Sequence, residues 1–190
     1  MKIGLFFGSF NPIHTGHLII ANHILNESTL DKIWFVVSPA NPFKTNSDLL
    51  DEVARLSLVE ISIQNDERIA ASDIEFPLSR PSFTINTLLV LRNDYPDHQF
   101  SIVMGSDNFR DLDKWKNYDD IISNYKILIY SRTGSEVKNE FNANIEVLNA
   151  PLLDISSTEI RKLVREGKSI RYLVPEPVEK EIRAKEYYKK

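Results

Sequence analysis

Length, composition and charge place the chain among ordinary globular proteins and exclude several classes of function. Its 190 residues are 42% hydrophobic and 26% charged, which is enough for one domain with a substantial core. The formal net charge of −4 argues against a surface that coats nucleic acid. The absence of cysteine excludes disulfides, thiolate catalysis and Cys-ligated zinc. The first residues are typical of a strand rather than a signal peptide, and no apolar run approaches the roughly 20 residues that span a bilayer.

These properties predict a single cytoplasmic domain over residues 1–190, with neither nucleic acid nor a membrane among its partners. Assembly into a homo-oligomer is left open by the sequence.

Six short apolar runs predict strands, and longer amphipathic segments between them predict helices. The strands are expected at Lys2–Phe7, Lys32–Ser38, Ile69–Ala71, Gln99–Gly105, Tyr125–Tyr130 and Ile145–Leu148. The helices are expected at Leu18–Asn26, Leu50–Ile63, Ser82–Tyr95, Tyr118–Ser123, Ile155–Gly167 and Val178–Tyr188. This alternation predicts an α/β fold with a doubly wound parallel sheet and C-terminal helices, in which ligands bind at the carboxyl ends of the strands.

Three polar segments predict mobility. The loops Pro39–Asp48 and Thr133–Asn144 lack a regular apolar pattern, and the first is expected to close on a ligand. The tail Lys185–Lys190 is polar and is expected to fray.

The segment after the first strand carries the strongest chemical signal. Residues 8–17 read Gly-Ser-Phe-Asn-Pro-Ile-His-Thr-Gly-His, with two imidazoles three residues apart between a strand and a helix. A helix N-terminus binds anions because its first N–H groups lack partners, and imidazoles add donors near neutral pH. The bland alternative is a corner with two unremarkable histidines, but no apolar face requires them there. The segment therefore predicts a phosphate site.

A second anion site is indicated near the C-terminus, where residues 156–161 read Ser-Ser-Thr-Glu-Ile-Arg. Ser156 or Ser157 could simply cap the helix, with Glu159 completing a capping box. Capping alone does not explain three consecutive hydroxyl residues followed by Arg161 in the first turn. Hydroxyls, helix N–H groups and a guanidinium together favour phosphate.

These two motifs resemble the H-x-G-H and I-S-S-T-x-I-R signatures of the nucleotidyltransferase superfamily. The chain is similar to bacterial nicotinate-nucleotide adenylyltransferases along nearly its whole length. Further similarity lies in the P-x-x-P-F-K, P-S-F-T-x-x-T-L, G-x-D…W and L-V-P-x-x-V segments, at Pro39–Lys44, Pro81–Leu88, Gly105–Trp115 and Leu173–Val178. Departures are Phe43, where histidine is common, and Ser106, where alanine or glutamine is common.

The resemblance implies a Rossmann-like nucleotidyltransferase that transfers the adenylyl group of ATP to nicotinate mononucleotide, giving deamido-NAD and pyrophosphate in NAD biosynthesis. It implies catalytic roles on phosphate for His14, His17, Lys44 and Arg161. Contacts to ATP are implied for Gly8, Ser9, Phe10, His14, His17, Gly105, Asp107, Arg132, Ser157, Thr158 and Arg161. Contacts to the acceptor are implied for Lys44, Ser82, Thr84, Asp107 and Trp115. Mg²⁺ is expected on the ATP phosphates, because no carboxylate cage for a protein metal site is visible.

Each of these roles has a structural alternative. Trp115 could be half-exposed core rather than a platform for the pyridine ring. Ser82 and Thr84 could cap a helix rather than receive the acceptor carboxylate. Lys44 could be a solvated surface lysine, and Asp107 could be a turn former. His23 and His98 lie outside the motifs, so we expect both to be structural.

Several rival functions share part of this pattern. Phosphopantetheine adenylyltransferases and cytidylyltransferases also carry H-x-G-H, so only the Pro81–Leu88 and Asp107–Trp115 segments separate them from the pyridine-nucleotide enzymes. An enzyme acting on nicotinamide mononucleotide is closer still. A non-catalytic nucleotide sensor is the rival of a different class, but it should have lost some of the charged phosphate contacts that are present here.

Overall fold

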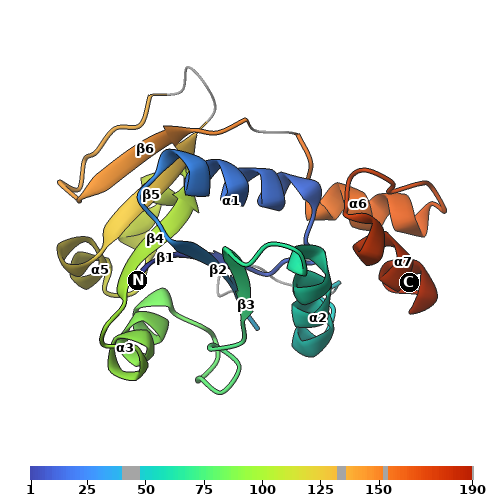
Figure 1. The fold of residues 1–190 in the computed structure, drawn as a ribbon, viewed down its shortest axis with the longest axis horizontal. Coiled ribbons are helices and arrows are strands. Elements are labelled where there is room, and N and C mark those ends of the chain that lie inside the picture. The colour runs from blue at the N-terminus through green and yellow to red at the C-terminus, as the bar shows by residue number, and fades with distance from the viewer. Residues whose placement is uncertain (40–47, 132–135, 152–153, 190) are drawn as a thin grey trace.

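The computed structural model describes residues 1–39, 48–131, 136–151 and 154–189. A six-stranded sheet in the order β3-β2-β1-β4-β5-β6 forms its centre (Figure 1). Its strands are β1 (Lys2–Gly8), β2 (Lys32–Val37), β3 (Ile69–Ser72), β4 (Gln99–Gly105), β5 (Lys126–Ser131) and β6 (Ile145–Asn149). Every neighbouring pair is parallel, so the predicted doubly wound parallel sheet is confirmed.

Seven helices are described along this part of the chain. They are α1 (Thr15–Glu27), α2 (Glu52–Ile63), α3 (Thr84–Asp94), α4 (Ser106–Arg110), α5 (Tyr118–Asn124), α6 (Ser157–Arg165) and α7 (Glu176–Ala184), with a 3-10 turn at Leu112–Lys114. The sequence pattern predicts neither α4 nor the 3-10 turn, because both are too short to show a helical period. It also starts α1 three residues late, at Leu18 instead of Thr15.

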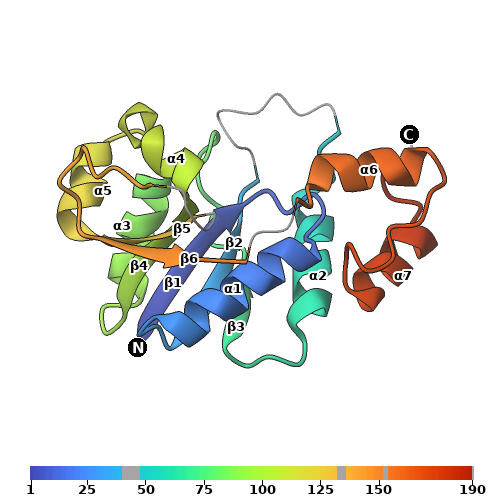
Figure 2. The ribbon, with the colours of Figure 1, turned by 90° about the horizontal axis from the view of Figure 1, so that it is seen from above.

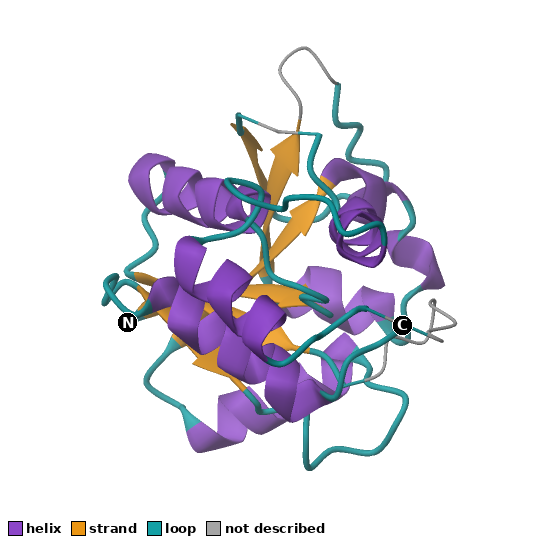
Figure 3. Cartoon of the chain, turned by 90° about the vertical axis from the view of Figure 1, so that its right-hand side faces the viewer, coloured by secondary structure: helices purple, strands orange, loops and turns teal. Residues whose placement is uncertain are grey.

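Helices cover both faces of the sheet (Figure 3). Along β4, Val103 enters one apolar cluster and its neighbours Ile102 and Met104 enter the other, because successive side chains point to opposite faces. The Val103 cluster contains the buried hydrophobic residues of α1, α2, α6 and α7. The other cluster contains those of α3, α4 and α5. Figure 2 shows α6 and α7 at the opposite end of the molecule from α3, α4 and α5.

The strand order reverses between β1 and β4. From β1 the chain moves outward through β2 to β3, then returns to β4 on the other side of β1. In open α/β sheets this reversal leaves a crevice outside the carboxyl ends of the two strands, and ligands bind there. The segments that follow β1 and β4 therefore flank the expected site.

The C-terminal tail is packed, so the prediction that it frays is wrong. Helix α7 ends at Ala184, and the N–H of Tyr187 then donates to the carbonyl of Ile182 at 3.1 Å. Tyr187 and Tyr188 both pack against the Val103 cluster. Burial raises the pKa of Tyr188. Two aromatic rings outweigh the polarity of the surrounding residues, because each can bury a large apolar area. Among the described residues, no helix is long and apolar enough to cross a membrane.

Candidate active site at the carboxyl edge of the sheet

The two histidines of the first motif belong to the start of α1 rather than to a loop. His14 is the N-cap residue of α1, and His17 lies in its first turn. The N–H of His14 donates to Nδ1 of His17 at 3.2 Å. Because Nδ1 of His17 accepts this bond, a neutral His17 carries its proton on Nε2. His17 is therefore arranged as a donor from Nε2.

Gly16 makes the close approach of these histidines feasible. The two imidazole rings are stacked, with centroids 3.7 Å apart and planes inclined by 23°. A Cβ on Gly16 would lie 3.0 Å from Nδ1 and 3.2 Å from Cε1 of His14. A side chain there would force the His14 ring to shift by a few tenths of an ångström. The glycine in H-x-G-H is thus favoured by ring packing, independently of any ligand.

His14 is held in its neutral form. Its side chain is 7% exposed, and burial lowers the pKa of His14 to about 4. Its Nδ1 atom is buried without a hydrogen-bond partner among the described residues. Phe10, which the sequence places among the ATP contacts, lies buried beneath this corner, with its ring 5.1 Å from that of His17 in an edge-on arrangement.

Helix α6 is docked directly on the loop that carries the first motif. Ser157 Oγ donates to the carbonyl of Pro12 at 2.8 Å, and Arg161 Nη1 donates to the carbonyl of Asn11 at 2.8 Å. Ser156 is the N-cap and accepts from the N–H of Glu159 at 3.2 Å, so the capping interpretation holds for Ser156. The Ser157 hydroxyl and the Arg161 guanidinium join the two motifs, while Thr158 is exposed.

Unpartnered polar atoms gather at the same edge of the sheet. In the described part of the chain, the buried atoms without a hydrogen-bond partner include Ser9 Oγ, His14 Nδ1, Ser82 Oγ, Ser131 Oγ and Arg161 Nε. Buried polar groups are ordinarily paired, so such a cluster calls for a partner that the described residues do not supply. A polar ligand at this edge would provide it.

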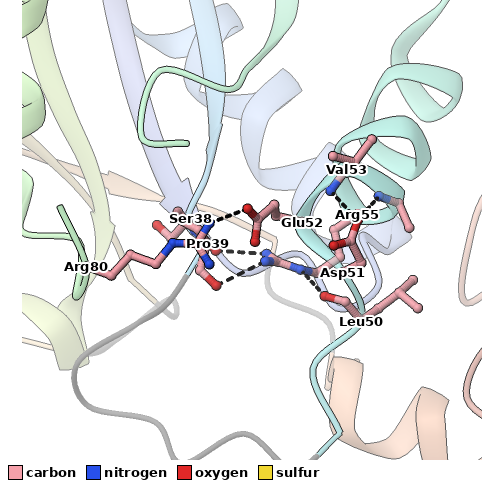
Figure 4. A network of polar contacts seen from close by, with 9 residues as sticks. Ser38, Pro39, Leu50, Asp51, Glu52, Val53, Arg55 and Arg80 are labelled. Atoms are coloured by element: carbon pink, nitrogen blue, oxygen red, sulfur yellow. Dashed lines mark hydrogen bonds and ion pairs between the residues drawn. The ribbon is translucent and has the colours of Figure 1, made fainter. Parts of the chain in front are cut away.

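Arg55 ties the loops at this edge together and was not anticipated from the sequence. Its side chain is fully buried (0% exposed), and among the described residues its guanidinium bonds to main-chain carbonyls (Figure 4). These carbonyls are Ser9 at 2.6 Å, Leu50 and Ser38 at 2.8 Å, and Pro39 at 3.2 Å. Burial lowers the pKa of Arg55 from its ordinary value, while the neighbouring acids Glu52 and Asp51 raise it.

A signal for Arg55 was present in the helical periodicity. Arg55 lies three and four residues before Leu58 and Val59, the other buried residues of α2, so it occupies their apolar stripe. An arginine in such a stripe is normally expected to reach solvent, because its charge is strongly hydrated. Here the surrounding carbonyls replace that water.

The second group of predicted residues lies at the start of α3. Phe83 is the N-cap residue of α3, and no side chain caps the helix. The capping alternative for Ser82 and Thr84 is therefore wrong, because Thr84 is the first helical residue and Ser82 Oγ has no partner among the described residues. Lys116 Nζ lies 4.6 Å from the centre of the Phe83 ring, which brings the segment of the half-buried Trp115 beside this helix start.

Asp107 lies at the end of β4, close to Gly105 and Tyr130. A Cβ on Gly105 would lie 2.5 Å from Asp107 Oδ1 and 3.3 Å from the Tyr130 ring. Burial, followed by the charge of Asp107, raises the pKa of Tyr130 to about 12. Asp107 is exposed and stands in the first turn of α4.

Two predicted site residues cannot be placed. Lys44 and Arg132 lie outside the described residues, as does most of the Pro39–Asp48 loop, so their roles and the expected loop closure remain predictions. Within the described ranges, no group of three or more His, Asp or Glu side chains could hold a metal ion.

Comparisons with known proteins agree with this geometry. A profile of the cytidylyltransferase-like family matches residues 5–163. A probable nicotinate-nucleotide adenylyltransferase of Cytophaga hutchinsonii is 48% identical, over 99% of this chain and 98% of its own length. A protein of Flavobacterium johnsoniae with the same description is 47% identical over the whole of both chains.

A solved structure also has the same fold. The nicotinic acid mononucleotide adenylyltransferase of Plasmodium falciparum, complexed with NaAD, superposes with a TM-score of 0.80 at 22% identity, covering 98% of this chain and 97% of its own. The family match, the full-length relatives and the arrangement of both motifs at one sheet edge lead to one assignment. The chain belongs to the cytidylyltransferase-like family of nucleotidyltransferases, within its nicotinate-nucleotide adenylyltransferase branch.

Proposed function

We propose that the chain transfers the adenylyl group of ATP to nicotinate mononucleotide, with ATP phosphates at the joined starts of α1 and α6 and the acceptor ring at the start of α3. One observation carries the phosphate half of this proposal. Ser157 and Arg161 bond to the same loop that positions His14 and His17, so two anion-binding helix starts converge on one point.

The chemistry suits this set of side chains. A phosphate oxygen of the mononucleotide attacks the α-phosphorus of ATP, and the bond from that phosphorus to the oxygen bridging to the β-phosphorus breaks, releasing pyrophosphate. The attacking oxygen is already anionic at neutral pH, so no protein base is required. Catalysis then depends on alignment and on neutralising the charge that develops on the transferred and leaving groups.

His17 and Arg161 have the geometry for that neutralisation. A neutral His17 carries its proton on Nε2, because Nδ1 accepts from the His14 backbone. The neutral His14 ring stacks on His17 and fixes its orientation. Arg161 carries a permanent charge into the loop, and its buried Nε is still without a partner among the described residues.

Magnesium belongs to the substrate in this proposal. The described residues offer no set of carboxylates for a resident ion, so Mg²⁺ would enter bound to the phosphates of ATP. Such an ion supplies charge neutralisation on the polyphosphate when bound.

Acceptor selection falls to the start of α3 and to Trp115. The uncapped start of α3 leaves Thr84 with an N–H and a hydroxyl to donate to the nicotinate carboxylate. An amide at this position would direct its NH₂ group at one donor and leave that donor unpaired. Trp115 lies beside this helix start and would stack on the pyridine ring.

The test is pyrophosphate release with ATP and Mg²⁺, comparing nicotinate mononucleotide, nicotinamide mononucleotide and phosphopantetheine as acceptors. We expect nicotinate mononucleotide to be preferred over the amide by at least about tenfold in kcat/KM. The His17→Ala variant should lose turnover far more than it loses melting temperature. Preference for another acceptor would overturn the assignment of the α3 end, and absence of release with all three would favour a nucleotide sensor.

A further inference from the structure

A buried acid lies directly behind the start of α3. Glu75, in the turn after β3, is 1% exposed. Its Oε1 accepts a hydrogen bond from Thr87 Oγ1 at 2.8 Å, and Thr87 is itself fully buried one turn into α3. A carboxyl group is rarely buried to this extent without a charged partner. Glu75 therefore needs an explanation beyond packing.

The other side of the Glu75 carboxyl faces two further hydroxyls. Burial raises the pKa of Glu75, and the hydroxyls of Thr87, Ser38 and Ser82 oppose this rise in decreasing order. By strict hydrogen-bond geometry Glu75 Oε2 and Ser82 Oγ both lack a partner among the described residues. The carboxyl group thus stands between the end of β2 at Ser38 and the residues on both sides of Thr84.

Through Ser38, Glu75 also connects the acceptor half of the site, at the start of α3, to the phosphate half, at the starts of α1 and α6. The hydroxyl of Ser38 faces Glu75, and its carbonyl accepts from Arg55 Nη1 at 2.8 Å. Arg55 in turn bonds to the carbonyl of Ser9 in the phosphate loop at 2.6 Å. The contacts of Glu75 and Arg55 therefore link the start of α3 to the phosphate loop (residues 8–17), and they fix the position of one relative to the other.

We propose that Glu75 is a positioning residue for the acceptor, holding Ser82 and Thr87 so that Thr84 meets the acceptor carboxylate, and that it sets the preference for the acid over the amide. This inference rests on the proposed function. A rigid donor is needed because a displacement of about 1 Å at a reacting site can lower the rate by about two orders of magnitude.

The experiment compares Glu75→Leu with Glu75→Gln. Leucine removes the bond to Thr87, whereas glutamine retains an oxygen that can accept it. We expect Glu75→Leu to raise the KM for nicotinate mononucleotide at least about tenfold and to lower the preference for the acid over the amide by a similar factor, while the KM for ATP changes less than about twofold. Glu75→Gln should restore the acceptor KM to within about threefold of the parent.

Two further variants keep the result decisive. Glu179 is a buried acid of α7 that pairs with Arg183 at 2.7 Å, so Glu179→Leu is the matched control and should leave both KM values unchanged. If Glu75→Leu does not fold, Thr87→Val removes the same bond from the other side and should still raise the acceptor KM selectively.

Suppose that the parent uses nicotinate mononucleotide. Equal changes in the KM values for ATP and the acceptor in Glu75→Leu or Thr87→Val would then overturn the role of Glu75, as would an unchanged preference for the acid over the amide. A parent enzyme that does not use nicotinate mononucleotide would instead overturn the proposed function, and this inference with it.

Discussion

The phosphate half and the acceptor half of the site are held in place by different kinds of side chain, arginines in the first and an acid in the second. In the phosphate half, Arg55 and Arg161 bond to main-chain carbonyls of loops that are distant in sequence. In the acceptor half, Glu75 bonds to a hydroxyl only 12 residues away. The cations both shape the loops and attract phosphate, whereas the acid can only shape its surroundings. The arginines of the phosphate half therefore suit an anionic ligand directly, whereas the acid of the acceptor half is buried, with its pKa raised by that burial.

The largest effect is expected from Arg55→Met. This substitution removes the clamp of the phosphate half, which is the set of hydrogen bonds from the Arg55 guanidinium to loop carbonyls. Four hydrogen bonds to loop carbonyls would be lost, and the carbonyls would remain buried without donors. We expect the free energy of unfolding to fall by on the order of 3–5 kcal/mol, measured by urea titration.

The control for Arg55 is Arg68→Met. Arg68 is exposed and pairs with Asp66, so its removal should shift the urea midpoint only slightly. Equal midpoint shifts in the two variants would contradict the clamp.

The second effect concerns the pH dependence of stability and depends on His14. Its pKa falls from an ordinary 6.5 to about 4 in the folded chain, so the unfolded chain binds more protons between these values. Stability is therefore complete above about pH 6.5 and is lost as the pH falls towards 4, by about 3 kcal/mol in total. Unfolding titrations of the parent and of His14→Gln across this range test the assignment. The parent should show the steeper decline, and parallel curves would contradict the burial of a neutral His14.

The smallest effect sharpens the comparison within the phosphate half. Gly16→Ala places a Cβ 3.0 Å from His14 Nδ1, so the ring must shift by a few tenths of an ångström against His17. We expect kcat/KM to fall about tenfold, equivalent to roughly 1.4 kcal/mol of transition-state stabilisation. Steady-state kinetics measure this loss.

Gly167→Ala is the matched control for Gly16. Gly167 has φ +67° but no heavy atom within 4 Å of an added Cβ, so the variant should lose about 1 kcal/mol of stability with unchanged kinetics. A similar kinetic loss in both variants would show that ring displacement is not the cause.

The sequence predicts the sheet and the phosphate corner well because both depend on local patterns. Apolar runs locate all six strands, and the spacing of His14 and His17 locates the corner. The sequence does not predict Arg55 or Glu75, because a charged residue is ordinarily solvated and only the assembled fold shows that carbonyls and hydroxyls surround it. The packing of Tyr188 against the Val103 cluster also depends on residues that are distant in sequence.

Arg55 recognises atoms that every amino acid carries. Its contact at Leu50 is to the carbonyl oxygen alone, so the side chain at this position can change without altering the clamp. Sequence drift among relatives should therefore be wider at Leu50 than at Arg55 itself, while Ser9 and Pro39 are also constrained by the motifs that contain them. One invariant guanidinium would then allow the surrounding loops to diverge while the site keeps its shape.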